Sequence, residues 1–257
     1  MSTVTFLGTG TSVGVPVIGC SCPVCTSEDP RNRRMRSSIF VESGELALLV
    51  DTGPDLRWQA LREGIDRVDA VLYTHHHSDH VLGFDELRAF CWHRESPLPI
   101  HAGQETIDSL ERMFPWGFDS ATRRNYTRAA PHQLDGPFTL DHVEIVPLPV
   151  EHGQAETFGF RFNFPEGASL AYLSDVKRIP EATKGLMQDL DALVVDSLRI
   201  VDHYSHMTLA EALATIDELS PKTGYLTHLT HDLDYTEISA DLPENVQLAV
   251  DQMKISF

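Results

Sequence analysis

Four side chains that can bind a metal lie within six residues of one another, and this density constrains the chain more than any other feature. The segment reads His75-x-His77-x-Asp79-His80. Imidazole and carboxylate together suit a divalent ion such as zinc, manganese or iron. The preceding residues 68–74 are apolar and β-branched, which predicts a buried strand. The four side chains therefore follow the carboxyl end of a strand, where α/β folds usually place their chemistry.

Other segments repeat this arrangement of an apolar run that ends near an acid or a histidine. The end residues are Asp51, His152, Asp175 and His228. Taken singly, each of these histidines would more often be an ordinary one. Taken together, each at a predicted strand end, they indicate that several strands contribute to one metal site.

In order and position, these segments resemble the five motifs of the metallo-β-lactamase superfamily, and they cover most of the chain. The resemblance implies two divalent ions, with zinc or manganese expected and iron a further candidate. One ion would bind His75, His77 and His152. The other would bind Asp79, His80 and His228, with Asp175 bridging the two. Asp51 would orient ligands, because metal-bound histidines usually donate their other N–H to a carboxylate or carbonyl.

A second cluster contains three of the four cysteines of the chain: Cys20, Cys22 and Cys25. Disulfides are not expected, since the chain is long enough for its own core and Cys20 stands too close to Cys22. Three thiolates at this spacing predict a tetrahedral structural zinc, and His231 is the fourth ligand that we expect. A redox role for these thiols is the alternative. Cys91 lies in an apolar stretch and is expected to be a small buried side chain.

The cysteine cluster, completed by His231, resembles the branch of the superfamily that contains phosphoribosyl cyclic phosphodiesterase. The loop over residues 9–16 resembles that branch as well. In it, a histidine placed like His206 is the general acid that protonates the leaving alcohol, and His203 is the alternative here. A histidine pKa of about 6.5 suits this task. Thr208 and Glu211 predict a capping box that begins the next helix; a surface histidine beside that helix is the other interpretation.

The net charge of the chain limits the macromolecules that it can bind. The formal net charge is −18, so the surface should repel long nucleic acids. The one compact basic run, residues 31–36, is expected to be a solvated loop rather than a phosphate anchor. This disfavours the tRNA 3′-processing endonuclease, which shares the metal motifs. The His-Glu-Ala-Thr box of that family is also missing, and Ser205-His206-Met207-Thr208 stands in its place.

Location and assembly are predicted from weaker signals. No apolar stretch reaches about 18 residues, so no membrane partner is expected. The first eight residues alternate like a strand and lack the features of a signal peptide. With cysteines that must stay reduced, this predicts a cytoplasmic protein. The resemblance adds a homodimer as the default oligomeric state, although no residue here requires it.

The pattern of apolar residues predicts one α/β domain over residues 1–257, an αβ/βα four-layer sandwich. Residues 116–133 show no period and are expected to form a loop, either a lid near the site or a plain surface connection. Residues 247–257 are expected to form a final hairpin or strand pair that closes one sheet. Strands are expected at 3–8, 46–51, 143–149, 157–163, 170–174, 192–196 and 223–227, and helices near 56–63, 107–114, 181–190 and 209–219.

The function predicted from these features is metal-dependent hydrolysis of a small phosphodiester, either cyclic or linear. A hydroxide that bridges the two ions would attack phosphorus, Asp79 and the other ligands would hold the ions, and His206 would protonate the leaving oxygen. Two alternatives stay open. One is hydrolysis of another small ester, thioester, lactone or β-lactam. The other is a non-catalytic metal-binding protein of cofactor biosynthesis, like the pyrroloquinoline quinone pathway relative that shares the cysteine pattern.

Overall fold

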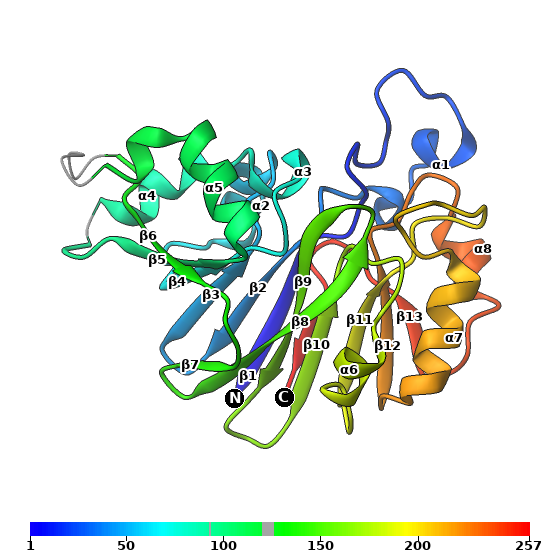
Figure 1. The fold of residues 1–257 in the computed structure, drawn as a ribbon. Helices are drawn as coiled ribbons and strands as arrows, with labels where there is room; N and C mark the ends of the chain where they lie inside the picture. The colour runs from blue at the N-terminus through cyan, green and yellow to red at the C-terminus, as the bar shows by residue number, and fades with distance from the viewer. Residues whose placement is uncertain (93, 120–125) are drawn as a thin grey trace.

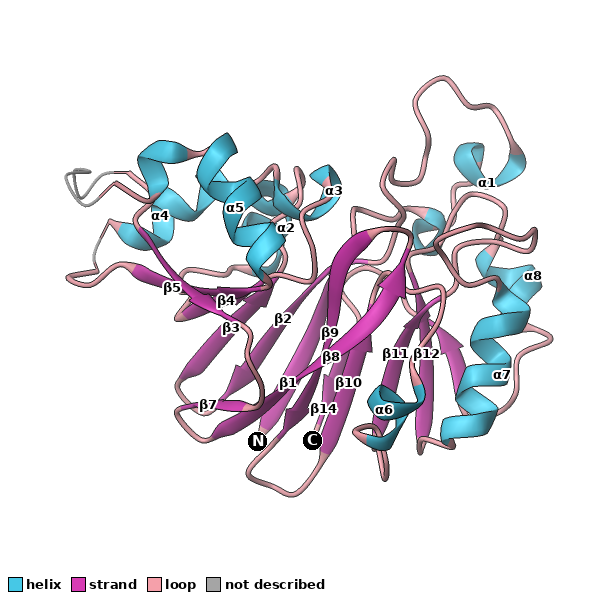
Figure 2. Cartoon of the chain, in the orientation of Figure 1, coloured by secondary structure: helices cyan, strands magenta, loops and turns pink. Residues whose placement is uncertain are grey.

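Two β-sheets lie face to face, and helices cover their outer surfaces (Figures 1 and 2). The computed structural model describes residues 1–92, 94–119 and 126–257. The first sheet has the order β14 (Lys254–Ser256), β1 (Ser2–Gly8), β2 (Ser38–Ser43), β3 (Leu46–Val50), β4 (Ala70–Leu72), β5 (Leu98–Ala102) and β6 (Ala129–Gln133). The second has the order β13 (Val246–Leu248), β12 (Thr223–Thr227), β11 (Ala192–Asp196), β10 (Ser169–Leu173), β9 (Ala155–Asn163), β8 (Val143–His152) and β7 (Phe138–Leu140).

Both sheets change from antiparallel to parallel pairing in the middle. In the first sheet, β1, β2 and β3 pair antiparallel, and β3 to β6 pair parallel. In the second sheet, β8, β9 and β10 pair antiparallel, and β10 to β13 pair parallel. The parallel strands of one sheet all end at one edge, so the residues that follow them meet there.

Helices flank both sheets, and short ones lie in the connecting loops. On the first-sheet side these are α2 (Leu56–Glu63), α4 (Arg88–Cys91) and α5 (Gln104–Met113). On the second-sheet side they are α6 (Glu181–Gly185), α7 (Leu209–Leu219) and α8 (Tyr235–Ser239). The loops contain α1 (Pro23–Thr26) and α3 (Ser78–Val81). Among the described residues, no helix combines the length and the apolar character needed to cross a membrane.

Three apolar clusters hold these layers together. Between the sheets lie buried side chains from both, including Phe6, Val41, Phe160 and Tyr172. The outer face of the first sheet packs on α2 and α5 through residues such as Leu56 and Leu110. The outer face of the second sheet packs on α7 through residues such as Ile216. The four-layer sandwich expected from the sequence is therefore confirmed, because each sheet has two apolar faces and buries both.

Most of the expected helices and strands are present, and the capping residues explain where helices begin and end. Gly64 takes the left-handed conformation that ends α2 (φ 67°), and Thr208 and Glu211 form the reciprocal capping box of α7. The helix expected over 181–190 ends at Gly185. Asp189 has a positive φ of 55°, which a continuing helix does not allow.

Two expectations for the later part of the chain are wrong. Residues 247–257 form no hairpin, because β13 joins the second sheet beside β12 while β14 joins the first sheet beside β1. Each short strand thereby covers the open edge of a different sheet. Part of the expected 116–133 loop is the edge strand β6. Arg123, Arg124 and Asn125, which belonged to that expected loop, lie outside the described residues.

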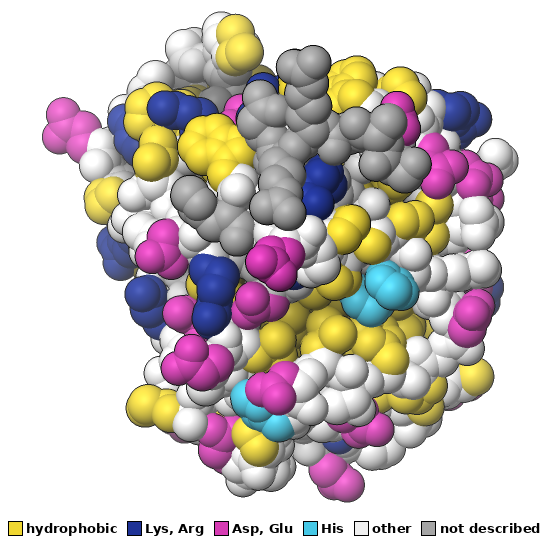
Figure 3. Space-filling view, turned by 90° about the vertical axis from the view of Figure 1, so that its left-hand side faces the viewer, with side chains coloured by type: hydrophobic (Ala, Val, Ile, Leu, Met, Phe, Trp, Pro, Cys, Tyr) yellow, Lys and Arg dark blue, Asp and Glu magenta, His cyan; other side chains and the backbone are white. Residues whose placement is uncertain are grey.

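A stack of three rings joins the two sheets at the edge opposite β13 and β14. His101 of β5 lies between His132 of β6 and Phe138 of β7, with ring centroids 4.9 and 4.5 Å apart. These rings line a hollow of about 390 Å³. Figure 3 shows this side of the molecule, where hydrophobic side chains gather in a hollow among charged ones. His101 Nε2 is buried, and no hydrogen-bond partner for it is found in the part of the chain that the structure describes. Burial therefore lowers the pKa of His101 from 6.5 to about 4.

This depressed pKa predicts a pH-dependent loss of stability that His101→Phe should remove. The unfolded chain takes up the proton below about pH 6.5 and the folded chain only near pH 4, so acidification through this window destabilises the wild type. Between pH 7 and about pH 5.5, His101→Phe should gain about 1 kcal/mol relative to wild type in urea unfolding. A difference between the two proteins that stays constant across this range would contradict the account.

Candidate metal centre

The predicted ligands converge at one edge of the two sheets, opposite the edge where the two termini lie (Figure 1). The structure brings together His75, His77 and His152 in one group, and Asp79, His80, Asp175 and His228 in another. Within each group the candidate ligand atoms lie within 4.8 Å of one another. They follow β4, β8, β10 and β12, so every contributing strand delivers its side chain from its carboxyl end.

Glycines and strained residues allow this close approach. A Cβ on Gly83 would lie 2.1 Å from the carbonyl oxygen of Gly53, so the loop after β3 can contact the turn after α3 only through glycines. Asp51 and His228 themselves have positive φ angles of 64° and 59°. Non-glycine residues rarely adopt this conformation, and it turns the chain sharply at the ends of β3 and β12.

Hydrogen bonds at Nδ1 fix most of the imidazole rings. His80 Nδ1 donates to Asp51 Oδ2 (2.7 Å), as the sequence predicted for this carboxylate. His152 Nδ1 donates to the carbonyl of Ser205 (2.8 Å), and His228 Nδ1 lies 3.2 Å from Ser37 Oγ. Since Ser37 Oγ donates to Gly10 O, it accepts from His228. Each of these rings therefore presents the lone pair of Nε2 to the centre of the group, as metal ligation requires.

The second group contains polar atoms that no hydrogen bond satisfies. Asp79 Oδ2, His80 Nε2, Asp175 Oδ2 and His228 Nε2 are all buried, and none has a hydrogen-bond partner among the described residues. Buried polar groups are nearly always paired, so a cluster of unpaired ones calls for a species that is not a side chain. Carboxylate oxygens and imidazole nitrogens that face one another at 3.2–3.4 Å accommodate a cation between them. The donor set thus fits a divalent metal.

Charge supports the same assignment. Burial lowers the pKa of most histidines here, which keeps them neutral and able to bind a metal: His75, His77, His152 and His228. Burial opposes ionisation of Asp175, but His228 and His80 more than offset this and hold the pKa of its carboxyl well below its usual value. Burial also works against a charged His80, yet the surrounding carboxylates raise its pKa. The same carboxylates favour a dication in place of that proton.

His206, the predicted acid, lies beside these groups. It forms a further candidate ligand set with His152 and Asp175. His206 Nδ1 donates to Asp196 Oδ2 (2.6 Å), and both side chains are buried. Sequence reasoning missed Asp196, although it ends the apolar run of β11 just as Asp175 follows β10. His203, the alternative acid, lies farther out, with its ring centroid 5.1 Å from that of His206.

The cysteine cluster forms a site of its own. Cys20, Cys22 and Cys25 place their sulfurs 3.3, 3.6 and 3.3 Å from His231 Nδ1, and none forms a disulfide. A tetrahedral zinc at ordinary bond lengths separates sulfur from nitrogen by about 3.5 Å. These four side chains therefore fit the zinc predicted from the sequence. Cys91 is fully buried in an apolar cluster, as expected.

The basic run over 31–36 is only partly the solvated loop that was expected, because Arg31 and Arg33 are exposed but Arg34 is buried. Arg31 pairs with Asp29, and Arg36 pairs with Asp55. Arg34 is 2% exposed and donates to the carbonyls of Thr230 and Leu233, both at 2.6 Å. Arg34 therefore holds the segment that follows His228 and contains His231. Sequence alone did not predict this, because no local pattern shows which arginine turns inward.

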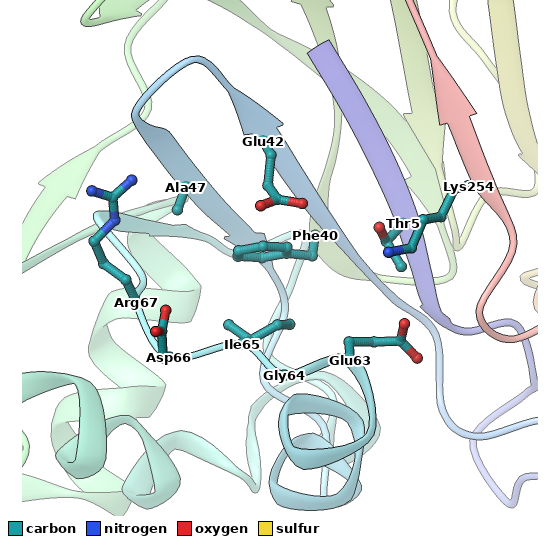
Figure 4. A pocket seen from close by; sticks show the side chains of 10 residues that line it. All are labelled: Thr5, Phe40, Glu42, Ala47, Glu63, Gly64, Ile65, Asp66, Arg67 and Lys254. Atoms are coloured by element: carbon teal, nitrogen blue, oxygen red, sulfur yellow. The ribbon is translucent and has the colours of Figure 1, made fainter. Parts of the chain in front are cut away.

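A separate hollow of about 500 Å³ lies on the outer face of the first sheet. Figure 4 shows Phe40 and Glu42 on one side and the turn after α2, with Asp66 and Arg67, on the other. None of the predicted ligands lines it. The chemistry of the chain is therefore assigned to the strand ends.

Replacing Arg34 should loosen both clusters. Arg34→Met removes the guanidinium donor from the carbonyls of Thr230 and Leu233, of which Leu233 is buried, and this should lower the free energy of unfolding by about 3 kcal/mol. It should also speed the release of zinc from the cysteine cluster to a chelator. Arg33→Met is the matched control, because Arg33 is exposed. Equal stability and equal zinc release in the two variants would show that Arg34 does not support these sites.

Comparison with known proteins places these features in a family. The model of the beta-lactamase superfamily domain matches residues 47–229. A solved structure described as a new diphosphatase from the PhnP family superposes with a TM-score of 0.92 at 39% identity, covering 100% of this chain and 97% of that one. Ribonuclease Z of Bradyrhizobium diazoefficiens is 27% identical, over 94% of each chain.

Another relative is longer than this chain. The octanoyltransferase of Porphyromonas gingivalis is 37% identical over 234 residues, which are 88% of this chain but 45% of that protein. The chain thus spans less than half the length of this relative. By its family model, its fold and its likeness to the diphosphatase, the chain belongs to the metallo-β-lactamase superfamily of hydrolases, within the PhnP-like branch.

Proposed function

We propose that the chain is a metal-dependent phosphodiesterase that cleaves a small phosphodiester, cyclic or linear. The observation that carries this proposal is the His206–Asp196 pair, which lies beside His152 and Asp175 of the ligand groups. An acid at this place is needed when the leaving group is an alkoxide, which departs poorly without a proton. Thioester and lactone hydrolysis need such an acid less. The likeness to a PhnP-family diphosphatase supports phosphorus chemistry.

In the proposal, the two groups of ligands hold divalent ions and the cysteine cluster holds a structural zinc. For the two ligand groups of the metal centre we propose zinc or manganese, with iron as a further candidate. When bound, such ions supply Lewis acidity and lower the pKa of a bound water to about 7. Residues 1–257 act as one domain in this proposal, and a cytoplasmic homodimer remains part of it.

The protein residues then have distinct tasks. Asp51, Ser37 and the Ser205 carbonyl keep the histidine rings in one orientation, so the ligand positions are fixed before a substrate arrives. Asp196 holds His206 by Nδ1, which leaves Nε2 to donate a proton to the leaving oxygen. Burial raises the pKa of Asp196, so a proton is favoured between this carboxyl and the ring.

A tRNA endonuclease is the second candidate, because a ribonuclease Z matches along 94% of both chains. The net charge of −18 and the internal ion pairs of Arg31 and Arg36 argue against it. A small substrate fits the acidic surface better. Cleavage of a precursor tRNA at a rate that exceeds cleavage of small diesters would reverse this preference.

Asp175→Asn should abolish turnover in a protein that still folds. The change keeps the size of the side chain but removes the charge between the two ligand groups. Loss of a residue that merely orients a ligand costs about 10–100-fold, so loss of a ligand should cost more. Hydrolysis of bis(p-nitrophenyl) phosphate and bound metal should be measured together. Asp217→Asn, an exposed acid on α7, is the control. Near-normal turnover of Asp175→Asn would refute the assigned site.

His206→Ala should slow the reaction in proportion to how badly the leaving group departs. With diphenyl phosphate, whose phenolate is strongly basic, the loss should be on the order of 10²–10⁴-fold. With bis(p-nitrophenyl) phosphate it should be much smaller. His203→Ala should show neither loss. A His203→Ala variant with this leaving-group dependence, beside a His206→Ala variant without it, would move the acid role to His203.

A further inference from the structure

The mouth of the metal centre opens into a cavity of about 610 Å³ with an uncharged wall. Two ligand histidines, His77 and His152, form its floor. The remaining lining residues are His76, Gly153, Gln154, Ala155, Tyr204 and Ser205. Among the described residues no lysine or arginine lines it, so they offer no cation to a second anionic group of a substrate. This wall therefore suits an uncharged part of a substrate better than a second anionic group.

Tyr204 presents an aromatic ring to this cavity. Its side chain is 81% exposed, so most of the ring surface is accessible to a ligand. The ring lies beside Gly153, where an added Cβ would come within 3.5 Å of Tyr204 Cε2. His203 contacts it from another side, with ring centroids 4.8 Å apart. The following residue, Ser205, binds His152 through its carbonyl, so the ring stands one residue from the metal centre.

The loop that contains Tyr204 is held in place by its own contacts. Arg199 donates to the carbonyls of Val201 (3.0 Å) and Asp202 (2.8 Å). The Asp202 carboxylate also accepts from Lys177 at 2.8 Å, and Lys177 bonds to Glu211 of α7. Because the loop is already fixed, a ligand that stacks on Tyr204 loses little free energy in ordering it.

Gln154 adds a second element of recognition. Its side chain is exposed at the same cavity, and an amide both donates and accepts hydrogen bonds. A flat ring whose rim carries donors and acceptors matches an aromatic face beside a free amide. A nucleobase has both features, whereas a sugar packs on a ring only through its C–H groups and an alkyl chain has no polar rim.

We propose that Tyr204 stacks on a nucleobase and that the substrates are nucleoside phosphodiesters. The inference rests on the proposed function, because it places the phosphate at the metal centre. The geometry assigns Tyr204 to substrate selection and leaves bond cleavage to the metal centre and His206.

The test compares two probes that differ only in the base. AMP and ribose 5-phosphate share the phosphate and the sugar, and their dissociation constants can be measured by calorimetry on the manganese-loaded protein. One base on one aromatic side chain is worth roughly 5- to 150-fold in affinity. Wild type should prefer AMP by a factor in this range. Tyr204→Ala should bind AMP as weakly as ribose 5-phosphate, with ribose 5-phosphate itself unaffected.

Two variants separate the ring from other effects. Tyr204→Phe should keep the preference, because it retains the ring face that makes the stack. Val201→Ala is a matched control, since Val201 is 69% exposed on the same loop but does not line the cavity. It should leave both constants unchanged, and unfolding temperatures should show that all variants fold.

Three results would overturn the inference: equal affinity of wild type for both probes, no measurable binding of either, or a preference for AMP that survives in Tyr204→Ala. Failure of the proposed function looks different. It appears as absent diester hydrolysis by the metal-loaded wild type, whether or not AMP is preferred.

Discussion

Three buried carboxylates share a small volume at the carboxyl edge of the sheets, and the arrangement of the site follows from their charge. Asp51, Asp79 and Asp175 are at most 6% exposed. In a poorly hydrated interior their mutual repulsion must be offset by positive charge. Without a metal, a proton on His80 would supply this positive charge, as the raised pKa of that side chain shows. A dication supplies more positive charge than that proton. The unpaired oxygens and nitrogens around it then become its ligands.

The same constraint explains the strain in the surrounding backbone. The left-handed conformations of Asp51 and His228 have an energetic cost, and so do the glycine contacts after β3 and α3. These backbone conformations turn the side chains at the strand ends inward, whereas in ordinary extended backbone the side chains would point into solvent. Metal binding can compensate for that cost, since binding to the folded state alone stabilises it. Arg34 links this centre to the cysteine cluster, because it donates to the carbonyl of Thr230, one of the two residues between His228 and His231.

The ligands could be predicted from the sequence because each follows an apolar strand. For His75, His152, Asp175 and His228 this local pattern indicated a shared site, and the resemblance to the metallo-β-lactamase superfamily supplied their grouping into two ligand sets. Asp196 carries the same signal and was missed, since no motif drew attention to it. Arg34, Ser37 and Tyr204 give no such signal, because their roles depend on which distant segments pack against them. The two final strands were misassigned for the same reason: pairing partners are set by which sheet edges stand open, and local sequence does not encode this.

The central claim is that the two histidine-rich groups are a metal centre. Anomalous X-ray diffraction from crystals grown with manganese or zinc, recorded at the absorption edge of each metal, tests it most directly. The account predicts two peaks among His75, His77, His152, Asp79, His80, Asp175 and His228, and a zinc peak between the three cysteines and His231. Density for the side chains without a peak between the histidines, in crystals that show the zinc peak, would contradict it.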